Sequence, residues 1–169
     1  MYYIYEELYP FNGGEHVNTI NDNLFRKIIK ESLGALIHKI DRSIYLKHNN
    51  MLKKYGITFR QSVVLSFLYH NRDNESINQK TIEEYMEVTG PSVTSIIQNM
   101  VKNDIITHRQ DENDGRNYRF ELTKKGMELQ GIGTNIFRTI NNILYQDLSE
   151  DEIETLKYLL TKVVKNMED

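Results

Sequence analysis

The sequence of 169 residues has no cysteine and no tryptophan. Without cysteine the chain has no disulfide, no thiolate metal ligand and no thiol-based redox sensor, which fits a reducing compartment. No apolar run approaches the roughly 20 residues that cross a bilayer, and the first residues lack the basic flank and apolar stretch of a signal peptide. We therefore expect a cytoplasmic protein without a membrane partner.

An excess of positive charge is also missing. The chain has 21 Lys and Arg against 24 Asp and Glu, a formal net charge of -3. A polyanion such as DNA needs local positive potential, so the distribution of charge matters more than its sum. Because 39% of the residues are hydrophobic and 27% are charged, we expect one ordinary globular domain with extensions.

Motifs of catalysis are absent as well. The chain has no Gly-x-Ser-x-Gly turn, no paired catalytic carboxylates and no phosphate-binding glycine loop. His38 and Asp41 have a spacing that lets two side chains of one helix share a metal ion. No third ligand follows the pattern, so a solvated or interface histidine is the better interpretation. We expect no enzyme, no metal site and no cofactor.

A long amphipathic helix is predicted near the N-terminus. Residues 1–19 are expected to form a short extended arm. From about Asn21 to Lys54, apolar residues then recur three and four positions apart, as on one side of a helix. These residues are Phe25, Ile29, Leu33, Leu36, Ile37, Ile40 and Ile44. A stripe of this kind needs a partner that covers it.

Three shorter helices are predicted next. Thr58 and Gln61 have the spacing of a capping box, which begins a helix there. Asn78 is a favourable N-cap for a second, short helix. The turn Thr89-Gly90-Pro91 leads into a third. The apolar residues expected in the core from the first two helices are Val64, Leu65, Leu68, Ile82, Tyr85 and Met86.

The third helix, about residues 91–103, has two contrasting sides. Its apolar residues fall on one side and are Val93, Ile96, Ile97, Met100 and Val101. The other side holds Ser92, Ser95, Gln98, Asn99 and Lys102. That side is polar and almost free of acid, which suits hydrogen bonds to base edges and phosphates. The solvated side of an ordinary amphipathic helix has the same composition, so this helix alone does not distinguish a DNA-binding surface from a solvated one.

A β-hairpin is predicted after Asp104, where the apolar pattern changes to period two. Ile106 and His108 fall on the first strand, and the second strand carries Tyr118, Phe120 and Leu122. The joining loop, residues 111–116, lies close to Arg109 and Arg119. A hairpin directly after a helix-turn-helix is a wing, although arginines at strand edges also serve simply to prevent aggregation.

Two further helices complete the chain. Residues 123–126 open a helix whose apolar stripe runs Leu129, Ile132, Ile136, Ile140 and Ile143; within it, Gly131 and Gly133 predict a local bend or a close packing contact. Ser149 and Glu152 form a second capping box. The apolar residues after it follow coiled-coil spacing and are Ile153, Leu156, Leu160, Val163 and Met167. A winged helix of about 80 residues cannot cover all these stripes, so we expect a homodimer.

The order of these elements resembles the MarR family of bacterial regulators. Three local segments carry the resemblance in register: Ser92-Val93-Thr94, the loop from Asp111 to Arg116, and Leu122-Thr123-Lys124-Lys125-Gly126. The resemblance covers about residues 20–168. It departs from the family where Glu83 replaces a small residue and where Glu87 and Asp104 stand in place of glycines.

The resemblance implies roles for individual residues. The third helix of the motif is expected to enter the major groove, and the wing tip to reach the adjacent minor groove. The residues that match the tip are Asp114 and Arg116, and the acid is expected to orient the guanidinium. The resemblance also implies a small-molecule effector bound between the dimerisation helices and the DNA-binding lobe.

Together these patterns predict a mostly α protein with a small antiparallel β wing. The winged helix-turn-helix is expected at 58–122, between a dimerisation helix at 20–57 and dimerisation helices at 123–169. The predicted function is a sequence-specific regulator of transcription, most simply a repressor, which acts as a homodimer on double-stranded DNA with a palindromic operator. The expected DNA-binding residues are Ser92, Thr94, Ser95, Gln98, Asn99, Lys102, Arg109, Asp114, Arg116 and Arg119. The alternative is a winged-helix module that docks a protein partner and does not bind DNA.

Overall fold

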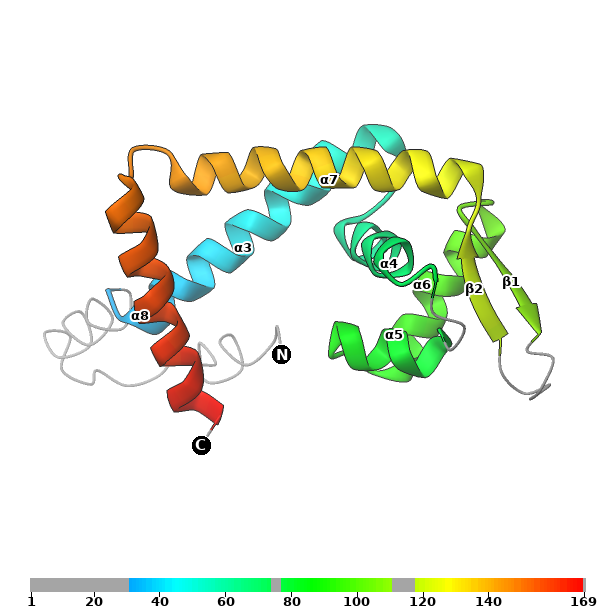
Figure 1. Cartoon of the computed structure of the whole chain (residues 1–169), viewed down its shortest axis with the longest axis horizontal. Helices are drawn as coiled ribbons and strands as arrows, with labels where there is room; N and C mark the ends of the chain where they lie inside the picture. Colours follow the sequence, from blue (N-terminus) through cyan, green and yellow to red (C-terminus); the bar gives the residue numbers. More distant parts are fainter. Residues whose placement is uncertain (1–30, 74–76, 111–117, 169) are drawn as a thin grey trace, which may run out of the picture. The chain divides into compact units, whose positions relative to one another are not determined.

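The computed structural model describes residues 31–73, 77–110 and 118–168, and the side chains of residues 109, 110 and 118 are not described. Its elements are α3 (Leu33–Leu52), a 3-10 turn (Lys53–Tyr55), α4 (Phe59–His70), α5 (Gln79–Met86), α6 (Gly90–Lys102), β1 (Ile106–Gln110), β2 (Tyr118–Leu122), α7 (Lys124–Tyr145) and α8 (Glu150–Glu168), as Figure 1 shows. This order confirms the predicted mostly α fold with a small antiparallel hairpin. The chain divides into a unit of residues 1–42 and a compact unit of residues 43–169.

The first predicted helix begins later than expected. Glu31 and Ser32 form a turn and a bend. The prediction of one helix from about Asn21 to Lys54 is therefore wrong at these two residues. The Ser32 hydroxyl accepts a hydrogen bond from the Ala35 backbone N–H at 3.2 Å, which caps the start of α3 at Leu33. The apolar spacing continues through Ser32, and the local cap outweighs it. The predicted arm, residues 1–19, lies outside the described residues.

Side-chain caps set the starts of the next helices. Thr58 and Gln61 make the predicted capping box at α4. Asn78 caps α5 as predicted, and Thr81 completes a second box there. The capping box predicted at Ser149 is also formed. The Ser149 hydroxyl and backbone N–H both donate to Glu152, each at 2.8 Å. Each box satisfies N–H groups that a helix end leaves unpaired.

The core lies in the unit of residues 43–169. The predicted residues Val64, Leu65 and Leu68 of α4 and Ile82 of α5 are all buried. Tyr85, also expected there, is 54% exposed and stacks its ring on Phe67 at 4.5 Å. Ile105, Ile106, Met100 and Phe120 join this core from α6 and the hairpin, so the hairpin packs on the same apolar cluster as the three helices.

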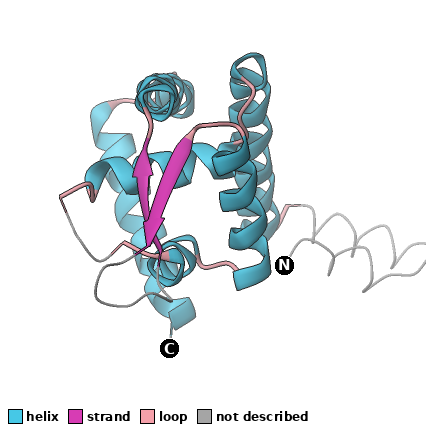
Figure 2. Cartoon of the chain, turned by 90° about the vertical axis from the view of Figure 1, so that its right-hand side faces the viewer, coloured by secondary structure: helices cyan, strands magenta, loops and turns pink. Residues whose placement is uncertain are grey.

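The hairpin is antiparallel, and its register is fixed over five pairs. Ile106 pairs with Leu122, His108 with Phe120 and Arg109 with Arg119. Because side chains alternate along a strand, Ile106, His108, Phe120 and Leu122 belong to one side of the ribbon. Ile106 and Phe120 are buried. Figure 2 shows the two strands side by side among the helices.

The start of α7 anchors the hairpin to the end of α6. The Thr123 hydroxyl caps α7 by accepting the Gly126 N–H at 3.0 Å, and it lies 2.8 Å from the Asp104 carbonyl, to which it donates. Lys125 donates to the Asn103 carbonyl at 2.8 Å. A Cβ added at Gly126 would lie 2.1 Å from the Ile105 carbonyl oxygen, a distance that atoms cannot adopt. The segment 122–126, called the joint below, connects the hairpin to α7 and packs against the residues that lead into β1.

Three acidic residues of the described part of the chain take the left-handed backbone conformation: Glu87, Asp104 and Asp147, the last at φ 64°. Glu87 ends α5 at φ 51°, and Asp104 follows α6 at φ 55°. These are the two positions at which glycine is usual in the family that the sequence resembles. The backbone keeps the left-handed conformation at both positions. Each residue other than glycine costs about 1–2 kcal/mol of folding free energy there.

This strain predicts a gain in stability on replacement by glycine. We expect Glu87→Gly and Asp104→Gly each to raise the free energy of unfolding by about 0.5–1 kcal/mol, since part of the relief is offset by the entropy of glycine in the unfolded chain. Urea unfolding followed by circular dichroism measures this. Glu87→Ala is the control, because alanine retains a Cβ and should give no gain. Equal stabilities of Glu87→Gly and Glu87→Ala would contradict the strain.

Candidate nucleic-acid interface

Helix α6 has the two sides that its sequence predicts. Val93, Ile97 and Met100 are buried, and Ile96 and Val101 are half-buried. On the other side, Ser95, Gln98 and Lys102 are exposed. Ser92 is half-buried. The helix contains no acidic residue. It therefore presents hydroxyl, amide and ammonium groups to solvent from a rigid, well-packed element.

Two of the predicted contact residues of α6 already bind other helices. The Thr94 hydroxyl accepts a hydrogen bond from the Gln79 amide at 2.8 Å and donates to the Gly90 carbonyl at 2.9 Å. The same Gln79 amide donates to Glu83 at 2.8 Å. Gln79 thus links α5 to the first turn of α6. The sequence gives no signal for this bond, because its partners lie 15 residues apart.

Asn99 is held in a similar way at the other end of α6. Its side-chain oxygen accepts a hydrogen bond from the buried Gln61 amide at 2.7 Å. The Gln61 oxygen in turn accepts the Thr58 backbone N–H at 2.8 Å, within the capping box of α4. Asn99 remains exposed. One residue, Gln61, therefore both caps α4 and fixes the end of α6.

The acid at Glu83 lies close to the N-terminus of α6. A Cβ built on Gly90 would be 3.2 Å from a carboxylate oxygen of Glu83. The side chain of the N-cap, Thr89, accepts no backbone N–H of the helix, and its hydroxyl donates to the Ser92 hydroxyl at 3.4 Å. A carboxylate at this end interacts favourably with the helix dipole. Glu83, one of the departures from the family pattern, is thus accommodated between the two helices of the motif.

The hairpin contributes positive charge at paired positions. Arg109 and Arg119 are direct partners in the ladder. Asp114 and Arg116, the predicted tip residues, lie outside the described residues, and so does the side chain of Arg109. Of the predicted wing residues, the structure thus describes the side chain of Arg119, which is half-buried.

The predicted dimerisation helices carry exposed apolar residues. In α8 no residue is buried, although Leu156, Leu159, Leu160 and Met167 are large and apolar. Met167 is 83% exposed. At the start of α3, the exposed apolar residues are Leu33, Leu36, Ile37 and Ile40. On each of these two helices, exposed apolar residues grouped in this way mark an interaction site.

The two glycines inside α7 differ in their surroundings. The expected close packing is present at Gly133, where an added Cβ would lie 3.4 Å from the Ser62 Cβ of α4. At Gly131 an added Cβ would meet nothing within 4 Å. The helix is continuous from Lys124 to Tyr145.

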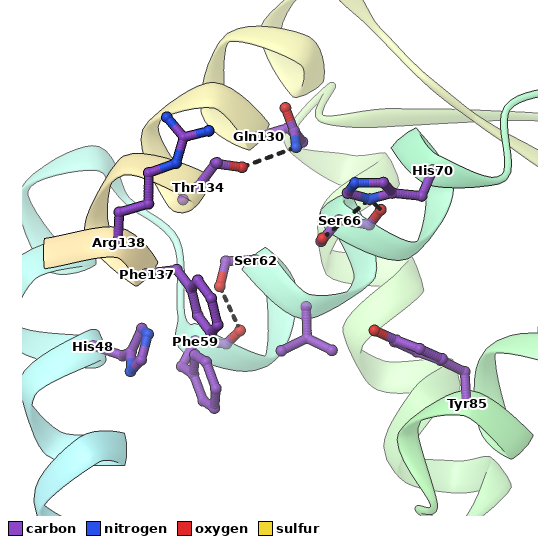
Figure 3. Close-up of a pocket in the computed structure, with 12 residues that line it drawn as sticks. His48, Phe59, Ser62, Ser66, His70, Tyr85, Gln130, Thr134, Phe137 and Arg138 are labelled. Atoms are coloured by element: carbon purple, nitrogen blue, oxygen red, sulfur yellow. Dashed lines mark hydrogen bonds between the residues drawn. The ribbon is translucent and has the colours of Figure 1, made fainter. Parts of the chain in front are cut away.

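A cavity of about 450 Å³ lies in the unit of residues 43–169. Side chains of α3, α4, α5 and α7 line it, and Figure 3 shows them as sticks. Phe59 and Phe137 flank His48, whose ring centroid is 4.3 Å from that of Phe59. His48 is 3% exposed, and burial lowers the pKa of its imidazole, against a smaller opposite effect of the bond to the Ile44 carbonyl. The resemblance implied an effector between the dimerisation helices and the DNA-binding lobe, but sequence reasoning assigned none of the residues that line this cavity to an effector site.

The part of the chain that the structure describes offers no metal site and no membrane-spanning helix. No three His, Cys, Asp or Glu side chains there gather closely enough to hold a metal ion. Among the same residues, no helix combines the length and apolar character needed to span a bilayer.

Three helices, of which the third exposes a polar side, followed by a hairpin define a winged helix-turn-helix protein. The sequence profile of the MarR family matches residues 55–117. The transcriptional regulator SarZ of Staphylococcus epidermidis is 24% identical over 136 residues, which span 79% of this chain and 90% of SarZ. MgrA of Staphylococcus aureus is 26% identical over 137 residues, or 80% and 90% of the two chains.

Solved structures give the same result. The chain is similar to Staphylococcus aureus MepR in a DNA complex, with TM-score 0.71 and 27% identity over 80% of this chain and 96% of MepR. It is also similar to a mutant MarR of E. coli complexed with operator DNA, with TM-score 0.68 and 27% identity over 83% and 97% of the two chains. The profile, the relatives and the solved structures all support a MarR-family winged helix-turn-helix transcriptional regulator.

Proposed function

We propose that this protein is a homodimeric repressor that binds a palindromic operator through α6 and the hairpin, in the cytoplasm. The exposed polar side of α6 carries the proposal. Ser95, Gln98 and Lys102 are exposed on a helix whose opposite side is fixed in the core, and the helix lacks acid. A helix of this kind fits the major groove, where amide and ammonium groups meet base edges and phosphates. The DNA complexes of MepR and MarR support the proposal.

The proposed contact residues divide into two groups. Within the described part of the chain, Ser92, Ser95, Gln98 and Lys102 make no hydrogen bond to another helix, and we assign them to DNA contact. Thr94 and Asn99 make hydrogen bonds to Gln79 and Gln61, so we assign them mainly to the orientation of α6.

The wing residues are assigned to the DNA backbone. Arg109 and Arg119 are direct partners in the ladder, and we propose that their guanidinium groups contact phosphates. From the sequence alone, we propose that Asp114 and Arg116 contact the minor groove. An arginine in a narrow minor groove responds to its shape and potential more than to individual bases.

A dimer places two recognition helices on the two halves of a symmetric operator. The apolar residues of α8 support this assembly, because a helix of 19 residues without a buried residue is not held by its own subunit's core. Repression follows from occupancy, since a dimer that covers an operator within a promoter excludes the polymerase. We further propose that a small molecule in the 450 Å³ cavity releases the DNA. The cavity touches both α5 of the helix-turn-helix and α7.

Loss of the amide at Gln98 tests the major-groove contact. We expect Gln98→Ala to weaken discrimination at particular base pairs by about 1–3 kcal/mol, because a bidentate contact to adenine is lost. Selection of bound sequences from a random library, followed by titration of single-base variants, measures this. Gln130→Ala on α7 is the control and should leave base preference unchanged. Equal weakening of Gln98→Ala on every sequence would assign Gln98 to the DNA backbone instead.

A further inference from the structure

The buried side chain of Gln61 holds its amide in one orientation. The oxygen, Oε1, lies 2.8 Å from the Thr58 backbone nitrogen and 3.3 Å from the Thr58 hydroxyl. A backbone N–H only donates, so the amide must turn its oxygen toward Thr58. Gln61 is 6% exposed, so other protein groups must meet the rest of the amide. Its nitrogen, Nε2, is therefore directed to α6.

The orientation of Gln61 sets that of Asn99. Gln61 Nε2 donates to the side-chain oxygen of Asn99, Oδ1, at 2.7 Å. Two NH2 groups cannot bond each other, so Asn99 must also turn its oxygen inward. Asn103 Nδ2 donates to the same oxygen at 3.2 Å. A carboxamide oxygen has two lone pairs, and in Asn99 both are therefore used.

The group that Asn99 offers to solvent is its NH2. The side chain is exposed, and no described residue accepts a hydrogen bond from Asn99 Nδ2. The neighbouring amide of Gln98 is also exposed, and within the described part of the chain it makes no hydrogen bond. Gln98 can therefore turn either end of its amide outward, whereas Asn99 presents donors alone.

This difference limits what Asn99 can bind on DNA. In the major groove, guanine offers two acceptors, N7 and O6, and thymine offers O4. Adenine and cytosine each place an amino group, a donor, at the corresponding edge, and an amide must offer its oxygen to accept it. Phosphate oxygens are acceptors as well. A group that only donates thus fits guanine, thymine or phosphate and does not favour adenine over guanine.

We infer that Asn99 contacts DNA as a donor-only group, and that Gln61 fixes it in this state. The ligand is a hydrogen-bond acceptor of DNA, either a phosphate oxygen or the acceptor edge of guanine or thymine. The inference rests on the proposed function, since it requires that α6 bind DNA. Asn99 is then a specificity-determining residue. Gln61 is buried and acts through Asn99, so it is a positioning residue.

Asn99→Ala identifies which acceptor is bound. The probes are duplexes that the wild-type protein selects from a random library, together with their single-base variants, and binding is measured by fluorescence anisotropy. A base contact predicts that discrimination of guanine over adenine, or of thymine over cytosine, falls about threefold to tenfold at one base pair. A phosphate contact predicts that all the duplexes weaken equally by about the same factor.

Gln61→Glu inverts the orientation of Asn99. An acid at this position still accepts the Thr58 N–H, as in an ordinary capping box, but its second oxygen faces Asn99. Asn99 must then turn its NH2 inward and its oxygen outward. We expect affinity for the wild-type duplex to fall at least about tenfold, and a base contact should shift its preference to adenine or cytosine.

A double-mutant cycle separates this effect from the added charge. With Asn99→Ala already present, Gln61→Glu should cause a loss at least about fivefold smaller, because no amide remains to be turned. With Gln98→Ala present, the matched control, the loss should equal that in the wild type. Gln61→Met breaks the bond to Asn99 without a charge and should reduce discrimination at the same base pair to less than about twofold. It replaces Gln61→Glu where circular dichroism shows that the acid does not fold.

Three results would overturn the inference. They are unchanged binding of every duplex by Asn99→Ala, loss of a preference for adenine over guanine in that variant, and a Gln61 substitution whose effect does not depend on Asn99. If the wild type binds DNA and any of these is found, the inference alone fails. If the wild type binds no duplex, the proposed function fails and the inference fails with it.

Discussion

Gly126→Ala is expected to unfold the joint between the hairpin and α7. The new methyl group would lie 2.1 Å from the Ile105 carbonyl oxygen, which also accepts a hydrogen bond from the Thr123 hydroxyl. The obstacle is backbone and not a flexible side chain, so the strands must shift. We expect a loss of about 3 kcal/mol in unfolding free energy and a fall in Tm of about 10 °C, measured by circular dichroism.

The matched control is Gly131→Ala in the same helix. An added Cβ there meets nothing within 4 Å. Alanine forms helix more readily than glycine by about 1 kcal/mol, so this variant should be more stable than the wild type. A Gly126→Ala protein as stable as the wild type would show that the joint at 122–126 is not packed as described.

Replacement of Leu156 and Leu160 together by Asp is expected to abolish the dimer. Both side chains are exposed on α8, a helix with no buried residue of its own. Two carboxylates on each subunit would bring four charges into an apolar interface, where burial of unpaired charge costs several kcal/mol. Light scattering should report monomer or unfolded protein.

Thr155→Asp with Thr161→Asp is the control for charge. It adds the same two negative charges to exposed positions of α8 that lie off the apolar stripe. This variant should remain dimeric. A folded dimer of the Leu156 and Leu160 double variant that still binds DNA would refute α8 as the interface.

Features of the fold that depend on neighbouring residues could be predicted from the sequence. Thr58 with Gln61 and Ser149 with Glu152 form boxes because both partners lie in one helical turn. The two sides of α6 follow from the periodicity of Val93, Ile97 and Met100. Periodicity failed at Ser32, because an apolar stripe continued across a residue whose hydroxyl caps a new helix.

The tertiary bonds of the candidate site could not be predicted. Gln61 and Asn99 are 38 residues apart, and nothing in the sequence pairs them. Asn99 was assigned to DNA contact because its position on α6 is polar, and its bond to Gln61 becomes visible only once α4 and α6 are packed. His48 resembles any polar residue of an amphipathic helix until its burial is known. The burial of its ring depends on residues from three other helices around the cavity.

The measurement that tests DNA binding most directly is fluorescence anisotropy with the intergenic DNA upstream of the protein's own gene, at several salt concentrations. We predict a complex with a dimer whose log affinity falls linearly with log salt. Arg116→Ala removes one cation from each wing, so the slope should become shallower by about 2, since each phosphate contact contributes roughly 0.9. Absence of a salt-sensitive complex there and across genomic fragments would contradict DNA binding and favour a module that docks a protein partner.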